Sequence, residues 1–205
     1  PCPDDDPLRA GIVHRLDADT SGVIICAKTQ GALDDLKTQF RERKVSKTYL
    51  ALVHGLVKKE EFSVDAPLER DPQRPVAVRV NKDQGRAAQT DFKRVELFEH
   101  AEISLVEAHP LTGRTHQIRV HLQHAEHPVI ADHLYSPHKG LEIDGKVILA
   151  RHALHAAKIE LSHPIGKQAL SFESPLAKDI QDASDQFKVL NPDEYITEIN
   201  SKGKM

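Results

Sequence analysis

The sequence indicates an α+β fold in which most strands pair in an antiparallel sheet. Short alternating apolar and polar stretches, separated by turns rich in proline and glycine, run through most of the chain and are typical of paired strands. Apolar residues follow the helical spacing in only two segments, one after Thr29 and one between Thr115 and Pro128. The chain contains no internal repeats, so we expect one sheet with a few helices.

The first half of the chain predicts a strand, a helix and then further strands. Residues 22–29 (GVIICAKT) predict a buried strand, after which Thr29 is expected to cap a helix with one apolar face. Residues 47–55 (KTYLALVHG) predict the next strand. Residues 66–75 are rich in proline and charge, which indicates a loop before a strand at 76–80.

The second half predicts an antiparallel pair, a helix and a long strand. Residues 87–98 and 101–110 have the pattern of two neighbouring strands. A helix is expected to begin near Thr115 and to end before Pro128, because proline cannot continue it. Residues 153–164 predict a strand that a Pro and Gly turn closes.

Length and composition set limits on the class of protein. The 205 residues, 39% of them hydrophobic, suffice for one good core. The longest apolar stretches, such as residues 23–27, fall far short of the roughly 18 residues of a membrane span, so no membrane role is predicted. Cys2 and Cys26 have no CxxC spacing, and the start at Pro1 shows no signal peptide. We therefore expect a cytoplasmic protein.

Charge is distributed unevenly along the chain. The net charge of −3 argues mildly against a nucleic-acid partner. However, residues 36–50 carry five lysines or arginines against one glutamate, whereas residues 173–198 carry seven acids against two lysines. The basic run is either the solvated end of a helix or one part of a face that binds nucleic acid.

Three polar clusters lie at the expected ends of strands and helices: HRLDADTSG at 14–22, SKTYLA at 46–51 and GRTHQIRVHL at 113–122. Each cluster alone also fits a structural role, as a turn, a strand with one buried tyrosine or a capped helix. In their order and spacing, however, the three resemble the motifs HRLD-x-x-TSG, K-x-Y and GR-[ST]-HQ-[IL]-R of the RluA family of RNA pseudouridine synthases. The resemblance runs from Gly11 to about Leu176.

The resemblance implies an α+β fold with a mixed, largely antiparallel β-sheet, flanking helices and a central catalytic cleft. We expect residues 1–205 to form a single catalytic domain that ends in an acidic segment at 177–205. Many family members carry an amino-terminal S4 domain, and no S4 domain is recognised in these residues. Residues 136–150 have the character of a loop insertion, to which the motifs assign no role.

The resemblance also implies that the chain isomerises uridines in structured rRNA or tRNA to pseudouridine, without a cofactor or a metal. This chemistry needs a carboxylate that attacks the sugar or removes a proton from it, and Asp17 is similar to the catalytic aspartate of the family. Asp19 lies at a variable position of the motif. Arg119 corresponds to the cation that keeps the carboxylate ionised. Tyr49 corresponds to the tyrosine that lies near the target base.

Six further residues are implied to contact RNA or the target base. They are His14, Arg15, Lys44, Lys47, Arg114 and Ile118. The target base must leave its stack to react, and His14 and Arg15 are expected to hold the resulting gap open. Ile118 is expected to line the pocket, while the lysines of the basic run bind the backbone. The chain is expected to act as a monomer.

Two alternatives come from other classes of protein. A non-catalytic RNA-binding or ribosome-assembly factor with this fold has no need of a buried carboxylate, so Asp17, Tyr49 and Arg119 together argue against it. The 13 histidines of the chain allow a metallohydrolase, with candidate ligands His116, His121, His124, His127, His152 and His155. No HExxH motif is present, and the spacing of His116 and His121 does not place both on one helix face.

Overall fold

The computed structural model describes residues 11–143, 145–189 and 196–200, and its main sheet is the frame for everything else. The helices of this part are α1 (Gln30–Arg41), α2 (Gln117–His124) and α3 (Lys178–Val189), with a short 3-10 helix at Glu99–Ala101. The strands are β1 (Ser21–Gly22), β2 (Ser46–His54), β3 (Glu61–Asp65), β4 (Leu68–Arg70), β5 (Val78–Val80), β6 (Gln89–Phe98), β7 (Ile103–Pro110), β8 (His138–Ile143), β9 (Lys146–Leu149), β10 (Leu154–Ser162), β11 (Ala169–Glu173) and β12 (Ile196–Asn200).

Seven of the described strands form the main sheet, in the order β1-β10-β2-β7-β6-β3, with β11 also paired to β10. Only β1 runs parallel to its neighbour, and the other described pairs of this sheet are antiparallel. A three-stranded sheet of β12, β8 and β9 and the β4–β5 hairpin complete the strands of the described part. The mixed, largely antiparallel α+β fold is therefore confirmed.

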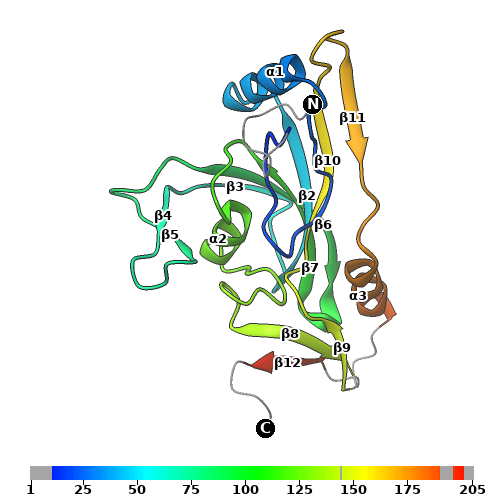
Figure 1. Ribbon diagram of the computed structural model, residues 1–205. Coiled ribbons are helices and arrows are strands. Elements are labelled where there is room, and N and C mark those ends of the chain that lie inside the picture. Colours follow the sequence, from blue (N-terminus) through cyan, green and yellow to red (C-terminus); the bar gives the residue numbers. More distant parts are fainter. Residues whose placement is uncertain (1–10, 144, 190–195, 201–205) are drawn as a thin grey trace.

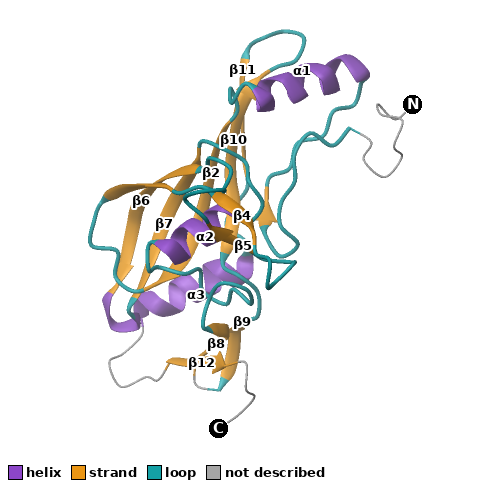
Figure 2. Cartoon of the chain, turned by 90° about the vertical axis from the view of Figure 1, so that its left-hand side faces the viewer, coloured by secondary structure: helices purple, strands orange, loops and turns teal. Residues whose placement is uncertain are grey.

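Helices cover both faces of the main sheet. Helix α2 and the β4–β5 hairpin lie on one face, α3 lies on the other, and α1 lies beside β11 at one end (Figures 1 and 2). The largest core cluster includes Leu122 of α2, Ile180 of α3 and the sheet residues Leu52, Phe92 and Val106, all almost fully buried. Because this core fixes α2 against the sheet, it also fixes the side chains that α2 directs away from the core.

The predicted helix after Thr29 is confirmed as α1. The hydroxyl of Thr29 accepts a hydrogen bond from the N–H of Ala32 at 3.3 Å, which caps the helix as expected. Its residues Leu33 and Leu36 are buried in a second cluster of apolar residues, which also contains Ile159 of β10. The other helix predicted from the sequence and the strands predicted near β2, β5, β6, β7 and β10 are also present.

The predicted buried strand at 22–29 is wrong. Only Ser21 and Gly22 pair with β10, and after them a single bridge joins Cys26 to Ile12. Ile24 is 50% exposed, so the apolar run does not lie in the core. The pairing stops early because β11 occupies the remainder of the same edge of β10, from Lys158 onwards.

The predicted loop at 136–150 is also wrong, because most of this segment forms the β8–β9 hairpin. Leu141 and Leu149 are fully buried in the main core cluster, so the hairpin is part of the fold and not an appended loop. The acidic segment at 177–205 contains α3, which was not foreseen. Ile180, Ala183 and Phe187 of α3 are buried.

Within the described residues, no helix has the length and apolar character needed to cross a membrane. The expectation of a single catalytic domain over residues 1–205 remains a prediction.

Candidate active site

A cleft of about 950 Å³ opens between the 13–20 loop, the end of α1, strand β2 and the segment that leads from β7 into α2. All nine residues that the sequence singled out line this cleft, and they are His14, Arg15, Asp17, Lys44, Lys47, Tyr49, Arg114, Ile118 and Arg119. They come from three distant segments of the chain. The fold therefore brings the three sequence motifs to one place.

The cleft is strongly basic although the chain as a whole is slightly acidic. Of the described residues that line it, seven are lysine or arginine and only Asp17 is acidic. The seven cations are Arg15, Arg41, Arg43, Lys44, Lys47, Arg114 and Arg119. Such a concentration of positive charge around an open groove suits a polyanion.

Asp17 and Arg119 form an ion pair at the base of the cleft. The Nη1 of Arg119 donates to Oδ2 of Asp17 at 3.0 Å, and the two side chains are 5% and 16% exposed. The carbonyl of Asp17 accepts a hydrogen bond from the N–H of Thr20, which closes the turn that carries the carboxylate. The expected pairing of these two residues is thus present, whereas the catalytic role of Asp17 remains a prediction.

A glycine allows this turn to join the sheet. Gly22 has a φ of 115°, and a Cβ on it would lie 2.1 Å from the carbonyl oxygen of Ala156. Only glycine tolerates this backbone and this approach to β10. Thr20 anchors the turn a second time, since its hydroxyl is 2.8 Å from Nε2 of the buried His152.

Asp132 holds Arg119 from the other side and was missed in the sequence analysis. The Nε and Nη2 of Arg119 donate to the two carboxylate oxygens of Asp132 at 2.6 and 2.7 Å. Asp132 has no exposed surface and also accepts from the N–H groups of Leu134 and Tyr135. Burial alone would raise the pKa of Asp132, but the hydrogen bonds and charge of Arg119 outweigh it, and the pKa is lowered. Asp132 therefore stays ionised and fixes the guanidinium in one orientation.

Tyr135 covers the face of the same guanidinium. The Cζ of Arg119 lies 4.9 Å from the centre of the Tyr135 ring. The hydroxyl oxygen of Tyr135 accepts from the N–H of Val78, and it lies 2.6 Å from Nδ1 of His116. Burial raises the pKa of Tyr135 to about 12, so this hydroxyl keeps its proton. Tyr135 thereby ties the β4–β5 hairpin to the start of α2.

His116 faces Asp17 from the start of α2. Its backbone is left-handed, with a φ of 55°, and its Nε2 lies 4.0 Å from Oδ1 of Asp17. Burial lowers the pKa of His116 against the opposing charge of Asp17, so the ring is neutral at pH 7. If Tyr135 donates its hydroxyl proton to Nδ1, the proton of the ring lies on Nε2, towards Asp17.

Tyr49 and Ile118 belong to the apolar part of the cleft wall. Tyr49 lies on β2 between Ala108 of β7 and Ala156 of β10. Burial, with a further contribution from the charge of Asp17, raises the pKa of Tyr49 to about 12. Ile118 is buried in the core cluster and is one of the residues that line the cleft.

His14 and Arg15 differ in how firmly they are held. Nε2 of His14 accepts from the N–H of Ile25 at 2.9 Å, and the ring stacks on Phe40 at 5.0 Å. Burial, followed by the charge of Lys47, lowers the pKa of His14 to about 4. His14 therefore braces the loop as a neutral residue, while Arg15 beside it is exposed.

The two lysines of the basic run also differ. Lys44 is exposed and pairs with Glu42 at 2.7 Å. Lys47 is half-buried, and burial lowers its pKa. Lys47 thus presents its charge from the wall of the cleft, whereas part of the charge of Lys44 is already balanced.

The histidines that suggested a metal site are dispersed or engaged elsewhere. His121 lies between Thr90 and the carbonyl of Ala66, and His155 lies between Ser21 and the carbonyl of Ser174. Among the residues that the structure describes, no three His, Cys, Asp or Glu side chains are arranged to hold a metal ion.

The mixed sheet and the largely buried carboxylate–guanidinium pair place this chain among α+β proteins whose basic cleft suits a polyanion. The sequence profile of one such family, RNA pseudouridylate synthase, matches residues 3–124. The chain belongs to this family, which confirms the resemblance carried by the three motifs.

Individual relatives agree with this assignment. The ribosomal large subunit pseudouridine synthase C of Vibrio parahaemolyticus is 41% identical over 170 residues, which cover 83% of this chain and 53% of that protein. An uncharacterized RNA pseudouridine synthase of Bacillus subtilis, YlyB, is 38% identical over 173 residues, 84% of this chain and 54% of that protein. This chain thus spans about half the length of these relatives.

The fold also matches a solved structure. Human RNA pseudouridylate synthase domain containing 1 superposes with a TM-score of 0.67 at 26% sequence identity, and the match covers 87% of this chain and 80% of the human one.

Proposed function

We propose that this chain isomerises uridine in structured RNA to pseudouridine, with Asp17 as the reacting carboxylate. The observation that carries the proposal is the position of Asp17, which is the one acid among the described cleft residues and is paired with an arginine that Asp132 fixes. The names of the relatives support rRNA of the large ribosomal subunit as the substrate over tRNA.

The reaction balances without a second substrate. The bond from N1 of uracil to C1′ of the ribose breaks, the base turns, and a bond from C5 to the same carbon forms. C5 loses one proton and N1 gains one. The carboxylate of Asp17 either attacks the sugar or removes a proton from it and later returns that proton. No atoms are gained or lost, so the chemistry requires no cofactor.

The neighbours of Asp17 suit these steps. Arg119 orients the carboxylate and stabilises its position as substrate displaces water from the cleft. Tyr49 keeps its proton at neutral pH, because its pKa is about 12, and it offers a hydroxyl beside the base. Tyr49 therefore takes the proton from C5 of the base only if another group accepts the hydroxyl proton of Tyr49 at the same time.

The basic wall suits RNA whose target base has left the stack. Arg15 is exposed at the cleft, where a planar guanidinium is able to stack on neighbouring bases. Lys47 and Arg114 also line the cleft, which supports them as contacts to phosphates. We take the protein to act as a monomer in the cytoplasm, with no membrane role.

The decisive experiment replaces Asp17 by asparagine, which keeps the size of the side chain but removes its charge. We expect Asp17→Asn to fold and bind RNA while losing essentially all single-turnover pseudouridine formation on large-subunit rRNA fragments. Asp19→Asn is the matched control, because Asp19 is exposed and the structure uses its carbonyl, which accepts from Arg151 at 2.7 Å. Normal turnover by a folded Asp17→Asn protein would favour a non-catalytic RNA-binding factor.

A further inference from the structure

Three arginines from distant parts of the chain lie near one another at or beside the cleft. Arg43 follows α1, Arg86 lies between β5 and β6, and Arg114 lies between β7 and α2. Arg43 and Arg114 line the cleft itself. Burial, followed by the positive charges of Arg86 and Arg43, lowers the pKa of Arg114, so the three charges act on one another.

Arg114 is held in a defined orientation. Its Nε donates to the carbonyl of Ala87 at 3.2 Å, and its backbone N–H donates to Oε1 of Gln117 at 3.0 Å. Ala87 directly follows Arg86, so this contact holds Arg114 against the backbone next to Arg86. Among the described residues, none accepts a hydrogen bond from the terminal nitrogens of Arg114. The two terminal nitrogens of this guanidinium are therefore held in one orientation, with no hydrogen-bond acceptor among the described residues.

Arg43 occupies a backbone conformation that most residues avoid. Its φ is 59°, in the left-handed region where glycine or asparagine usually ends a helix. The carboxyl end of α1 favours a cation, which accounts for one arginine at this place. The helix end does not explain why Arg86 and Arg114 come close to this place from other segments. A left-handed residue other than glycine costs free energy and is common where function requires a certain side chain.

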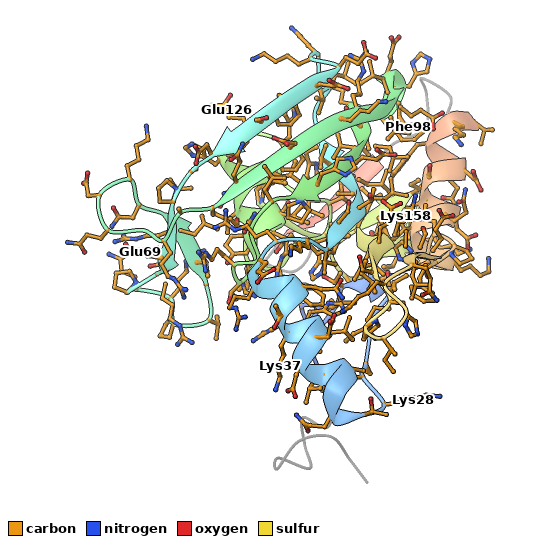
Figure 3. The ribbon with its side chains drawn as sticks, turned by 90° about the horizontal axis from the view of Figure 1, so that it is seen from above. Lys28, Lys37, Glu69, Phe98, Glu126 and Lys158 are labelled. Carbon is orange, nitrogen blue, oxygen red and sulfur yellow. The ribbon has the colours of Figure 1, made fainter. Side chains whose placement is uncertain are left out.

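Two carboxylates beside these arginines are paired with other cations, one next to Arg43 in the chain and one next to Leu68, whose backbone pairs with that of Arg86. Glu42, beside Arg43, contacts Lys44 at 2.7 Å. On the β4–β5 hairpin, Glu69 contacts Arg79 at 2.8 Å. Figure 3 shows where Glu69 on this hairpin and Lys37 on α1 lie around the molecule. Neither carboxylate forms an ion pair with the three arginines, and a bound anion would lessen the repulsion among their positive charges.

We propose that Arg43, Arg86 and Arg114 together bind one backbone phosphate of the RNA at the rim of the cleft. This rests on the proposed function, which makes RNA the substrate. Guanidinium forks match the oxygens of a phosphate diester, and such a contact fixes the register of the strand without reading its sequence. The arginine cluster, Arg43 with Arg86 and Arg114, therefore positions the RNA whose uridine lies at Asp17.

The first experiment measures RNA binding as a function of salt. Arg43→Gln, Arg86→Gln, Arg114→Gln and the triple variant are made in the Asp17→Asn background, so that turnover does not disturb binding. The probe is a large-subunit rRNA hairpin that the wild type modifies or, if it modifies none, the hairpin that it binds most tightly. Arg70→Gln is the control, because Arg70 is exposed on β4 and outside the cleft.

We expect each arginine variant to weaken binding about tenfold at physiological salt and the control to change it little. If the three share one phosphate, the triple variant lowers the slope of log K against log salt by about 0.7 to 0.9, the value for a single phosphate. A decrease of about 2 or more would mean separate phosphates and would overturn the shared site. Binding equal to the control would overturn it as well.

The second experiment locates the phosphate on the RNA. Neutral methylphosphonate linkages are placed one at a time, each after a 2′-O-methylated nucleotide, around the target uridine. We expect the Asp17→Asn parent to lose affinity at one position that the triple variant no longer senses. Equal sensitivity of both proteins at every position rejects the inference.

The two proposals fail in different ways. Binding that depends on the arginine cluster, in a wild-type protein that forms no pseudouridine on any rRNA fragment, contradicts the proposed function alone. Normal pseudouridine formation by a protein whose arginine variants bind like Arg70→Gln contradicts the phosphate site alone.

Discussion

Arg119 and Asp132 meet through two parallel hydrogen bonds of 2.6 and 2.7 Å, and this contact directs the remaining guanidinium nitrogen towards Asp17. Asp132, which is fully buried, thus fixes Arg119, and Arg119 in turn holds the less buried Asp17. The arrangement separates a structural carboxylate from the one proposed to react, although both contact the same arginine.

Asp132→Asn is expected to cost stability as well as activity. The substitution removes a fully buried charge and leaves Arg119 with only the Asp17 carboxylate, so we expect a loss of roughly 3 kcal/mol in the free energy of unfolding. Urea unfolding measures this loss, with Asp19→Asn as the exposed control. An unchanged midpoint and slope would show that the two-point contact contributes nothing to stability.

Arg119→Lys is expected to lower single-turnover pseudouridine formation by at least about 100-fold. One ammonium group cannot bind both oxygens of Asp132 and also reach Asp17, as the guanidinium does. RNA affinity should change much less, because the basic residues at the rim remain. A rate within a few-fold of wild type, in a protein with normal thermal unfolding, would contradict this role.

Lys44 and Lys47 are expected to contribute unequally to RNA binding. Lys47→Gln should weaken binding across many RNA sequences and lower the salt slope by about 1, because Lys47 lies in the cleft wall. Lys44→Gln should have a smaller effect, since Lys44 is paired with Glu42. Filter binding at several salt concentrations compares the two variants and their combination. If even the double variant leaves the salt slope unchanged, the basic run at 36–50 is a solvated helix end and does not bind RNA.

His152 is expected to make the protein less stable in mild acid. Burial, followed by the charge of Arg119, lowers the pKa of His152 from 6.5 to about 4. Between these values the unfolded chain binds a proton that the folded protein does not, so stability falls as the pH decreases through this window. The contribution is present in full above pH 6.5.

The measurement is urea unfolding at pH 7 and pH 5, compared with His152→Gln, which does not titrate. The wild type should lose up to about 2 kcal/mol more than the variant between these two pH values. Equal losses in both proteins would mean that His152 does not remain neutral in the fold.

Local pattern explains why most strands and the cleft residues were predictable. Strands β6 and β7 are antiparallel neighbours in the chain. The alternation of their residues and the turn between them therefore suffice to predict both strands. The motif residues Asp17, Tyr49 and Arg119 were found because their order and spacing are specific, and all of them line one cleft.

Non-local pairing explains the errors. The apolar run that begins at Val23 has the composition of a strand, but strand formation there depends on the edge of β10, which β11 shares. Strand β8 pairs with β12, more than fifty residues later in the chain, and no local signal reveals such a partner. Asp132 was missed because sequence pattern does not show that an acid is buried against an arginine.

The anchoring of the Asp17 turn on β10 also determines when the site assembles. Thr20 contacts His152, a residue 132 positions later, and Ser21 pairs with His155. Closing so large a loop is costly in chain entropy. The contacts that offset this cost form only when β10 is in place. On the ribosome, the turn that carries Asp17 must therefore wait until the segment that forms β10 has been synthesised. Until β10 has formed, the carboxylate of Asp17 lacks its anchor on the main sheet, so we expect chemical competence to appear late in folding.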